Sequence, residues 1–263
     1  MPDTTLQRPP FQTTHWISLL ELIGITAGFF FIVWQIGPNL DSNGLTMPLT
    51  LVLGMFLLYI TMISPSRIHR DSLAERGLGD WRSAFLRTDN LTPALRSYGV
   101  LMISATAVIL VLAIFVRPTQ FTDINPEALV TRFALYLFSA IGQDLLFLSF
   151  FFLRFRHLLD LSPWNGATKR VMVCVLCASL FTLFHLPNVP VMTTTLLTGF
   201  ASAWIWYATP NLVAAAFCHA VVGTLLHQVL EVHMRIGPFY WDSEKYVFRT
   251  LFPVLRQIIG DLY

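Results

Sequence analysis

The chain has 263 residues, of which 55% are hydrophobic and 12% are charged, whereas soluble proteins average about 25% charged residues. The mean hydropathy of +0.62 argues against a soluble domain, and a formal net charge of only +2 gives no support for nucleic-acid binding. Several apolar runs reach the roughly 20 residues that a membrane-spanning helix needs. Open strands cannot cross lipid, because their edge groups would lack hydrogen-bond partners. The composition therefore predicts an all-α polytopic membrane protein.

Seven apolar segments follow a polar N-terminal tail, residues 1–15. The predicted spans are 16–36, 45–64, 97–116, 129–153, 169–185, 189–208 and 211–230. Proline, glycine and asparagine separate several of them, because these residues break helices or favour turns. We expect one transmembrane domain over residues 16–230, with about seven helices (six to eight), and an amphipathic C-terminal tail over residues 231–263.

Arginines are concentrated in the loop after the second span and, with one lysine, in the loop after the fourth. By the positive-inside rule, the N-terminus is predicted to be cytoplasmic, and the protein lies in the inner membrane if the source is prokaryotic. The segment Gly77–Arg87 places apolar side chains at helical spacing with arginines between them. This spacing predicts an amphipathic helix on the membrane surface.

Polar residues also occur inside the predicted spans. Asp144 lies past the middle of 129–153, and His185 and His219 lie in two later spans. A charged group at the bilayer centre costs about 2.5–3.5 kcal/mol on insertion scales, so such a residue usually has a partner or a function. At about 1.5 Å per residue, all three fall in the middle third of the bilayer, so we expect them to meet around one buried site. Glu21, near the interface, is expected to be solvated or paired with a nearby arginine.

The chemistry of this set leaves several interpretations open. A carboxylate and a histidine can hold and deprotonate a water molecule, while a second histidine stabilises an oxyanion. Two histidines and one carboxylate can also form a zinc site. Histidines within membranes often serve only as hydrogen-bonding residues between helices, and a protonatable residue at mid-depth also suits a proton-coupled transporter. The three cysteines, Cys174, Cys177 and Cys218, fit small packing residues.

The spacing of these residues resembles the CPBP family of intramembrane proteases (CAAX protease and bacteriocin-processing, or Abi). The family's FxxxH motif is matched by Phe181 and His185, and His219 begins a motif of the form HxxxN, in which Gly223 replaces asparagine. The resemblance extends over about residues 140–226.

The family's first motif, EExxxR, aligns with Gln143, Asp144 and Leu148. The resemblance implies an intramembrane endopeptidase in which Asp144 takes the place of the missing glutamate base. It implies that His185 holds the water and that His219 donates to the oxyanion. A catalytically inactive relative that binds a membrane peptide is the alternative.

The predicted partners are membrane lipid and a membrane-associated peptide or protein, and nucleic acid is not expected. No cofactor is required by this chemistry. If a divalent metal such as zinc is used, the carboxylate of Asp144 and the imidazoles of His185 and His219 are its predicted ligands.

Overall fold

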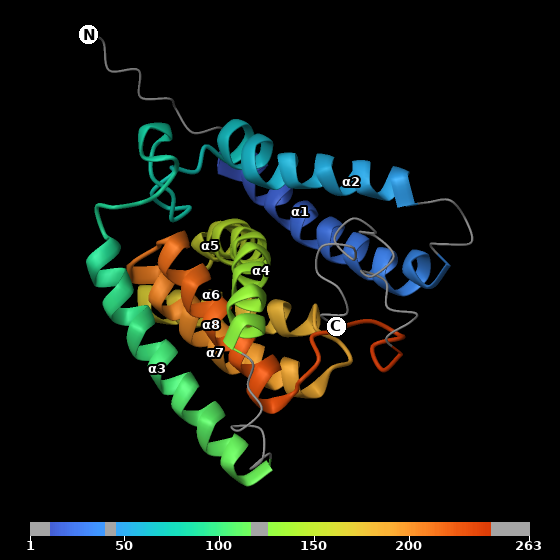
Figure 1. Ribbon diagram of the computed structural model, residues 1–263. Helices are drawn as coiled ribbons and strands as arrows, with labels where there is room; N and C mark the ends of the chain where they lie inside the picture. Colours follow the sequence, from blue (N-terminus) through green and yellow to red (C-terminus); the bar gives the residue numbers. More distant parts are fainter. Residues whose placement is uncertain (1–10, 40–45, 117–125, 243–263) are drawn as a thin grey trace.

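The structure is a computed structural model that describes residues 11–39, 46–116 and 126–242 (Figure 1). These residues form helices and turns, with no strand among them. The longer elements, in chain order, are α1 (Phe11–Phe31), α2 (Thr46–Leu58), η4 (Tyr59–His69), α3 (Leu91–Val116), α4 (Pro126–Asp144), η7 (Leu145–Phe151), α5 (Phe152–Asp160), α6 (Gly166–Leu183), α7 (Val189–Ala208) and α8 (Leu212–Leu230). The predicted all-α fold is confirmed.

Six helical segments in the described residues are long and apolar enough to cross a membrane. They are Thr14–Ile36, Pro48–His69, Leu91–Val116, Leu129–Asp160, Gly166–Leu183 and Leu212–Leu230. The remaining predicted span, 189–208, coincides with α7, which has the length of a span but is not one of the six. Its row of threonines lowers its hydropathy. The protein is therefore a multi-pass integral membrane protein, within the predicted range of six to eight spans.

Helices α1 and α2 run along one edge of the molecule and α3 along the opposite edge, with α4 to α8 between them (Figure 1). Small residues allow the central helices to approach closely. Ala140 on α4 packs against Ala216 and Ala220 on α8, and all three are buried. The ring of Phe181 on α6 lies against Gly199 on α7, where an added Cβ would be 3.2 Å from the ring. These contacts bring the predicted polar residues into the centre of the fold.

The segment Gly77–Arg87 differs from its prediction. It contains only a single 3₁₀ turn, Trp81–Ser83, and Ala84 and Phe85 then adopt positive φ angles of 52° and 63°. Asp80 caps this turn by accepting a hydrogen bond from the Ser83 N–H at 2.9 Å. The capped turn and the following left-handed residues close the chain on itself, so helical spacing of apolar residues was a misleading signal here. Trp81 and Phe85 are nevertheless exposed, as a membrane-interface segment requires.

Both predicted tails lie largely outside the described residues. The tail 1–15 overlaps α1, which begins at Phe11. Of the tail 231–263, only 231–242 is described, and it forms turns in place of helix. The prediction of an amphipathic segment at 243–263 lies outside the described residues.

Candidate functional site

Asp144 is the last residue of α4, where the helix changes from α to π geometry. The π-helical turn η7 follows directly, and α5 then continues the same rod to Asp160. Insertions of π geometry in α-helices frequently occur at functional sites. Asp144 is 5% exposed, although it lies in a segment apolar enough to span the membrane. The carboxylate of Asp144, which is energetically costly to place inside a membrane, is therefore buried in the folded protein.

His219 on α8 is the partner of Asp144. Its Nδ1 lies 3.1 Å from Asp144 Oδ1. An ionised carboxylate only accepts hydrogen bonds, so Nδ1 carries the proton and Nε2 keeps a free lone pair. The second oxygen, Asp144 Oδ2, is buried and has no hydrogen-bond partner. Buried polar atoms are rarely left unsatisfied, so this oxygen marks a place for water or a polar ligand.

The N-terminal end of α8, the helix that carries His219, is held in place by Asn211. The side chain of Asn211 accepts from the Ala214 N–H at 3.1 Å, which caps the helix. Its amide donates to the carbonyl of Arg87 at 2.8 Å and to Asn90 Oδ1 at 2.9 Å. The polar loop before α3 thus sets the position of α8, and with it the position of the imidazole.

A cavity of about 40 Å³ opens beside this pair. A buried water needs at least about 10–15 Å³, so this cavity, which Asp144 and His219 line, has room for water. Six elements contribute to its wall: α3, α4, η7, α6, α7 and α8. The lining residues are Leu101, Asp144, Phe147, Leu148, Cys177, Ala178, Phe181, Thr198, Gly199, Ser202, Cys218, His219 and Val222.

His185 does not join the pair directly. Its Nδ1 lies 2.8 Å from the carbonyl of Phe181, so this nitrogen is the donor and Nε2 has the lone pair. The Phe181 ring packs edge-on against both imidazoles, at 4.9 Å from His185 and 5.7 Å from His219. Phe181 thus contacts both histidines, and no hydrogen bond joins His185 to Asp144 or His219 in the described structure.

Two further predicted positions lie away from the cavity wall. Gln143 donates from Nε2 to Ser139 Oγ at 3.0 Å, on the same helix and away from the lining residues. Gly223 packs against Tyr136 of α4, and a Cβ added there would lie 2.9 Å from Tyr136 Cδ1 and closer still to Cε1. The ring of Tyr136 therefore fills the space that an asparagine side chain would need to enter.

The residues present do not fit a metal site. Asp144 and His219 are in contact, but no group of three or more His, Cys, Asp or Glu side chains among the described residues could hold a metal ion.

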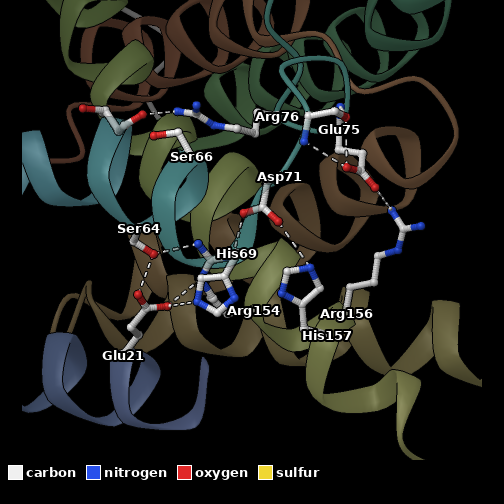
Figure 2. A network of polar contacts seen from close by, with 12 residues as sticks. Glu21, Ser64, Ser66, His69, Asp71, Glu75, Arg76, Arg154, Arg156 and His157 are labelled. Atoms are coloured by element: carbon white, nitrogen blue, oxygen red, sulfur yellow. Dashed lines mark hydrogen bonds and ion pairs between the residues drawn. The ribbon is translucent and has the colours of Figure 1, made fainter. Parts of the chain in front are cut away.

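A second buried polar cluster joins α1, η4 and α5 (Figure 2). Arg154 is completely buried and donates from Nε to Glu21 Oε2 at 2.6 Å and from Nη1 to Asp71 Oδ2 at 2.8 Å. Its Nη2 donates to Ser64 Oγ at 2.9 Å. Glu21 also contacts His69 Nε2 at 3.0 Å. Of the two environments predicted for Glu21, solvation or pairing with an arginine, the structure shows pairing with an arginine.

Asp71 completes this cluster just beyond the second span. Its Oδ1 lies 3.3 Å from His157 Nε2. Burial alone would raise the pKa of Asp71, but the hydrogen bond from His157 and the charge of Arg154 outweigh it and hold the pKa below its ordinary value. The rings of His157 and His69 stack at 5.3 Å. None of its residues lines the cavity beside Asp144 and His219, and its contacts fasten α1, η4 and α5 to one another.

The comparison with protein families gives one match. The family described as Type II CAAX prenyl endopeptidase Rce1-like matches residues 125–225. The resemblance to CPBP proteases is confirmed. The match runs from the start of α4 into α8 and includes Asp144, His185 and His219, while α1 to α3 lie outside it. No curated protein and no solved structure matches the chain. Over this part of the chain, the protein is similar to CAAX-protease-like intramembrane peptidases.

Sequence reasoning did not identify several residues that the structure places at these sites. On the cavity wall these are the hydroxyl-bearing residues of α7 and the thiol of Cys218, and in the second cluster they are His69, Asp71 and His157. The run of threonines and serines in α7 was the available signal, because hydroxyls in an apolar span need either a backbone acceptor or a polar ligand.

Proposed function

We propose that the chain is an intramembrane endopeptidase in which Asp144 and His219 activate water. The single observation that carries this proposal is the 3.1 Å contact between Asp144 Oδ1 and His219 Nδ1 at the wall of a cavity that has room for water. This contact orients the imidazole and leaves Nε2 as a base. The role of His219 thus differs from the oxyanion donor that the family resemblance implied.

The reaction follows from these atoms. His219 Nε2 takes a proton from water, and the hydroxide attacks the carbonyl carbon of the scissile peptide bond. The carboxylate of Asp144 stabilises the imidazolium through Nδ1–H. The imidazolium then gives the Nε2 proton to the leaving nitrogen, and the C–N bond breaks. The apolar wall around the pair excludes bulk water and strengthens each electrostatic interaction.

The substrate class follows from the membrane setting and the family match. The cavity lies among helices that cross the membrane, so the scissile bond must belong to a membrane-associated peptide or protein. The family match makes a prenylated peptide the first substrate to test. In this scheme, His185 acts through its free Nε2 as a second acceptor for a polar group near the Phe181 ring.

Cleavage of a fluorogenic farnesylated CAAX peptide by the purified protein in liposomes tests the proposal. Asp144→Asn is expected to lower kcat about 100- to 10,000-fold, because general-base catalysis contributes that much and the base, His219, loses the carboxylate that orients it. Gln143→Ala is the matched control, because the neighbouring side chain bonds to Ser139 and does not line the cavity. Unchanged turnover in Asp144→Asn would refute the assignment. Binding of the peptide without turnover by the wild-type protein would instead indicate an inactive relative.

A further inference from the structure

The proposed mechanism requires a hydrogen-bond donor that the residues discussed so far do not supply. Attack on a peptide carbonyl places negative charge on its oxygen, and a donor aimed at that oxygen lowers the barrier. His219 is the base, and its Nδ1–H is committed to Asp144. The Nδ1–H of His185 is committed to the Phe181 carbonyl, so Nε2 of the neutral ring has no proton to donate. Gly223 has no side chain, and Tyr136 fills the space beside it.

Most other donors on the cavity wall are also engaged. The thiol of Cys177 donates to the carbonyl of Phe147 at 3.2 Å. The hydroxyl of Thr198 donates to the carbonyl of Thr194, one helical turn earlier, at 2.8 Å. Cys218 carries a thiol, which is only a weak donor. Ser202 is the remaining hydroxyl among the lining residues.

Ser202 differs from its neighbours on α7 in how its hydroxyl is used. Thr193, Thr194 and Thr198 each donate to the carbonyl four residues before them. The Ser202 hydroxyl has no hydrogen-bond partner in the part of the chain that the structure describes, whereas its carbonyl accepts from the Tyr98 hydroxyl at 3.2 Å. This bond to α3 fixes the backbone of α7 at Ser202. The backbone at Ser202 is therefore held in place by α3, while the Ser202 hydroxyl can still bind a ligand. Ser202 lies on the same cavity wall as Asp144 and His219.

We propose that Ser202 is a catalytic residue whose hydroxyl donates to the oxyanion formed during peptide hydrolysis. The inference rests on the proposed function, since it assigns a residue to that reaction. It places the donor on α7 and the base on α8, at the wall of one cavity, so the substrate carbonyl would bind within that cavity. Close packing of α7 on α6 at Gly199, one turn before Ser202, keeps the hydroxyl near the cavity.

Kinetics of Ser202→Ala on the farnesylated CAAX peptide test this role. Removing one oxyanion donor typically lowers kcat about 100- to 1000-fold, and we expect that loss with KM unchanged. Ser202→Thr keeps the hydroxyl and is expected to retain most of the activity. Thr193→Val is the matched control, because it removes a hydroxyl of the same helix that already donates to a backbone carbonyl and does not line the cavity.

A binding experiment separates the donor role from a packing role. A peptide aldehyde, whose hydrate has the tetrahedral geometry of the intermediate, should inhibit Ser202→Ala at least 10-fold more weakly than the wild type. Binding of the uncleaved peptide should be unchanged. Equal inhibition of both proteins, or an equal loss of kcat in Thr193→Val, would overturn the inference. Full activity of Asp144→Asn would refute the proposed function itself, whatever the role of Ser202.

Discussion

Replacing Arg154 with methionine should cost more stability than replacing any other charged residue of its helix. The guanidinium has no exposed surface and contacts Glu21, Asp71 and Ser64, and it also lies 4.6 Å from the centre of the Phe150 ring. Methionine keeps most of the volume but leaves two buried carboxylates without their arginine. Removal of one partner from a buried ion pair costs about 3–5 kcal/mol.

The cost should be visible as a shift of the unfolding temperature. For a chain of this size about 1 kcal/mol corresponds to roughly 2–4 °C, so the expected decrease is about 6–20 °C. Far-UV circular dichroism of the purified protein in detergent would measure it. Arg156→Met is the matched control: this arginine is two residues further on, and its side chain is 44% exposed and 3.8 Å from Glu75. An exposed pair contributes about 0–1 kcal/mol, so the control should shift by only a few degrees.

A double replacement tests directly whether Glu21 and Arg154 stabilise the protein as a pair. In Glu21→Gln combined with Arg154→Met, the carboxylate that loses its partner is removed together with the guanidinium, so the loss should be smaller than the sum of the two single losses. Equal unfolding temperatures for Arg154→Met and Arg156→Met, or strictly additive losses in the double variant, would refute the view that this cluster fastens α1 and α5 together.

Two further predictions concern packing and pH. Gly223→Asn, which restores the family's third motif, should destabilise the protein by about 1–3 kcal/mol because its Cβ overlaps the Tyr136 ring, and Tyr136→Ala in the same chain should recover part of the loss. Equal thermal stability of Gly223→Asn and the wild type would contradict that steric account. Asp71 has a folded-state pKa below its unfolded value of about 3.9, so its contribution is present above that pH and is lost as the pH falls through the folded-state pKa. The wild type should therefore lose more stability than Asp71→Asn between pH 6 and pH 3, and parallel pH profiles of unfolding temperature would argue against this contribution.

The spans could be predicted from the sequence because the membrane itself sets their length and composition. The predicted span 189–208 coincides with α7, and the other predicted ends fall within seven residues of the observed ends. The depth argument also placed Asp144 and His219 at the same level, and the structure brings them into contact. Depth along a helix follows from counting residues, so it needs no knowledge of how the helices pack.

Rotation about the helix axis could not be predicted in the same way. The ring of Phe181 lies against both His185 and His219, and no pattern in the sequence announces this arrangement. Tyr136 beside Gly223 and the free hydroxyl of Ser202 likewise depend on which faces of neighbouring helices meet. The buried partners of Arg154 were missed for another reason. His69 and Asp71 lie where a span ends, and polar residues at such positions are normally solvated.

The π-helical turn after Asp144 has a consequence for how this chain is aligned with its relatives. In π geometry the backbone bonds connect residues five apart, so each such turn holds more residues than an α-helical turn. Residues counted four apart in the first motif therefore need not share a face in this chain. Leu148 aligns with the family's arginine by counting, whereas the buried arginine of this rod is Arg154, beyond the end of η7. Homologues without this turn would require a gap within residues 145–151, and equivalent side chains should be assigned there from superposed backbones.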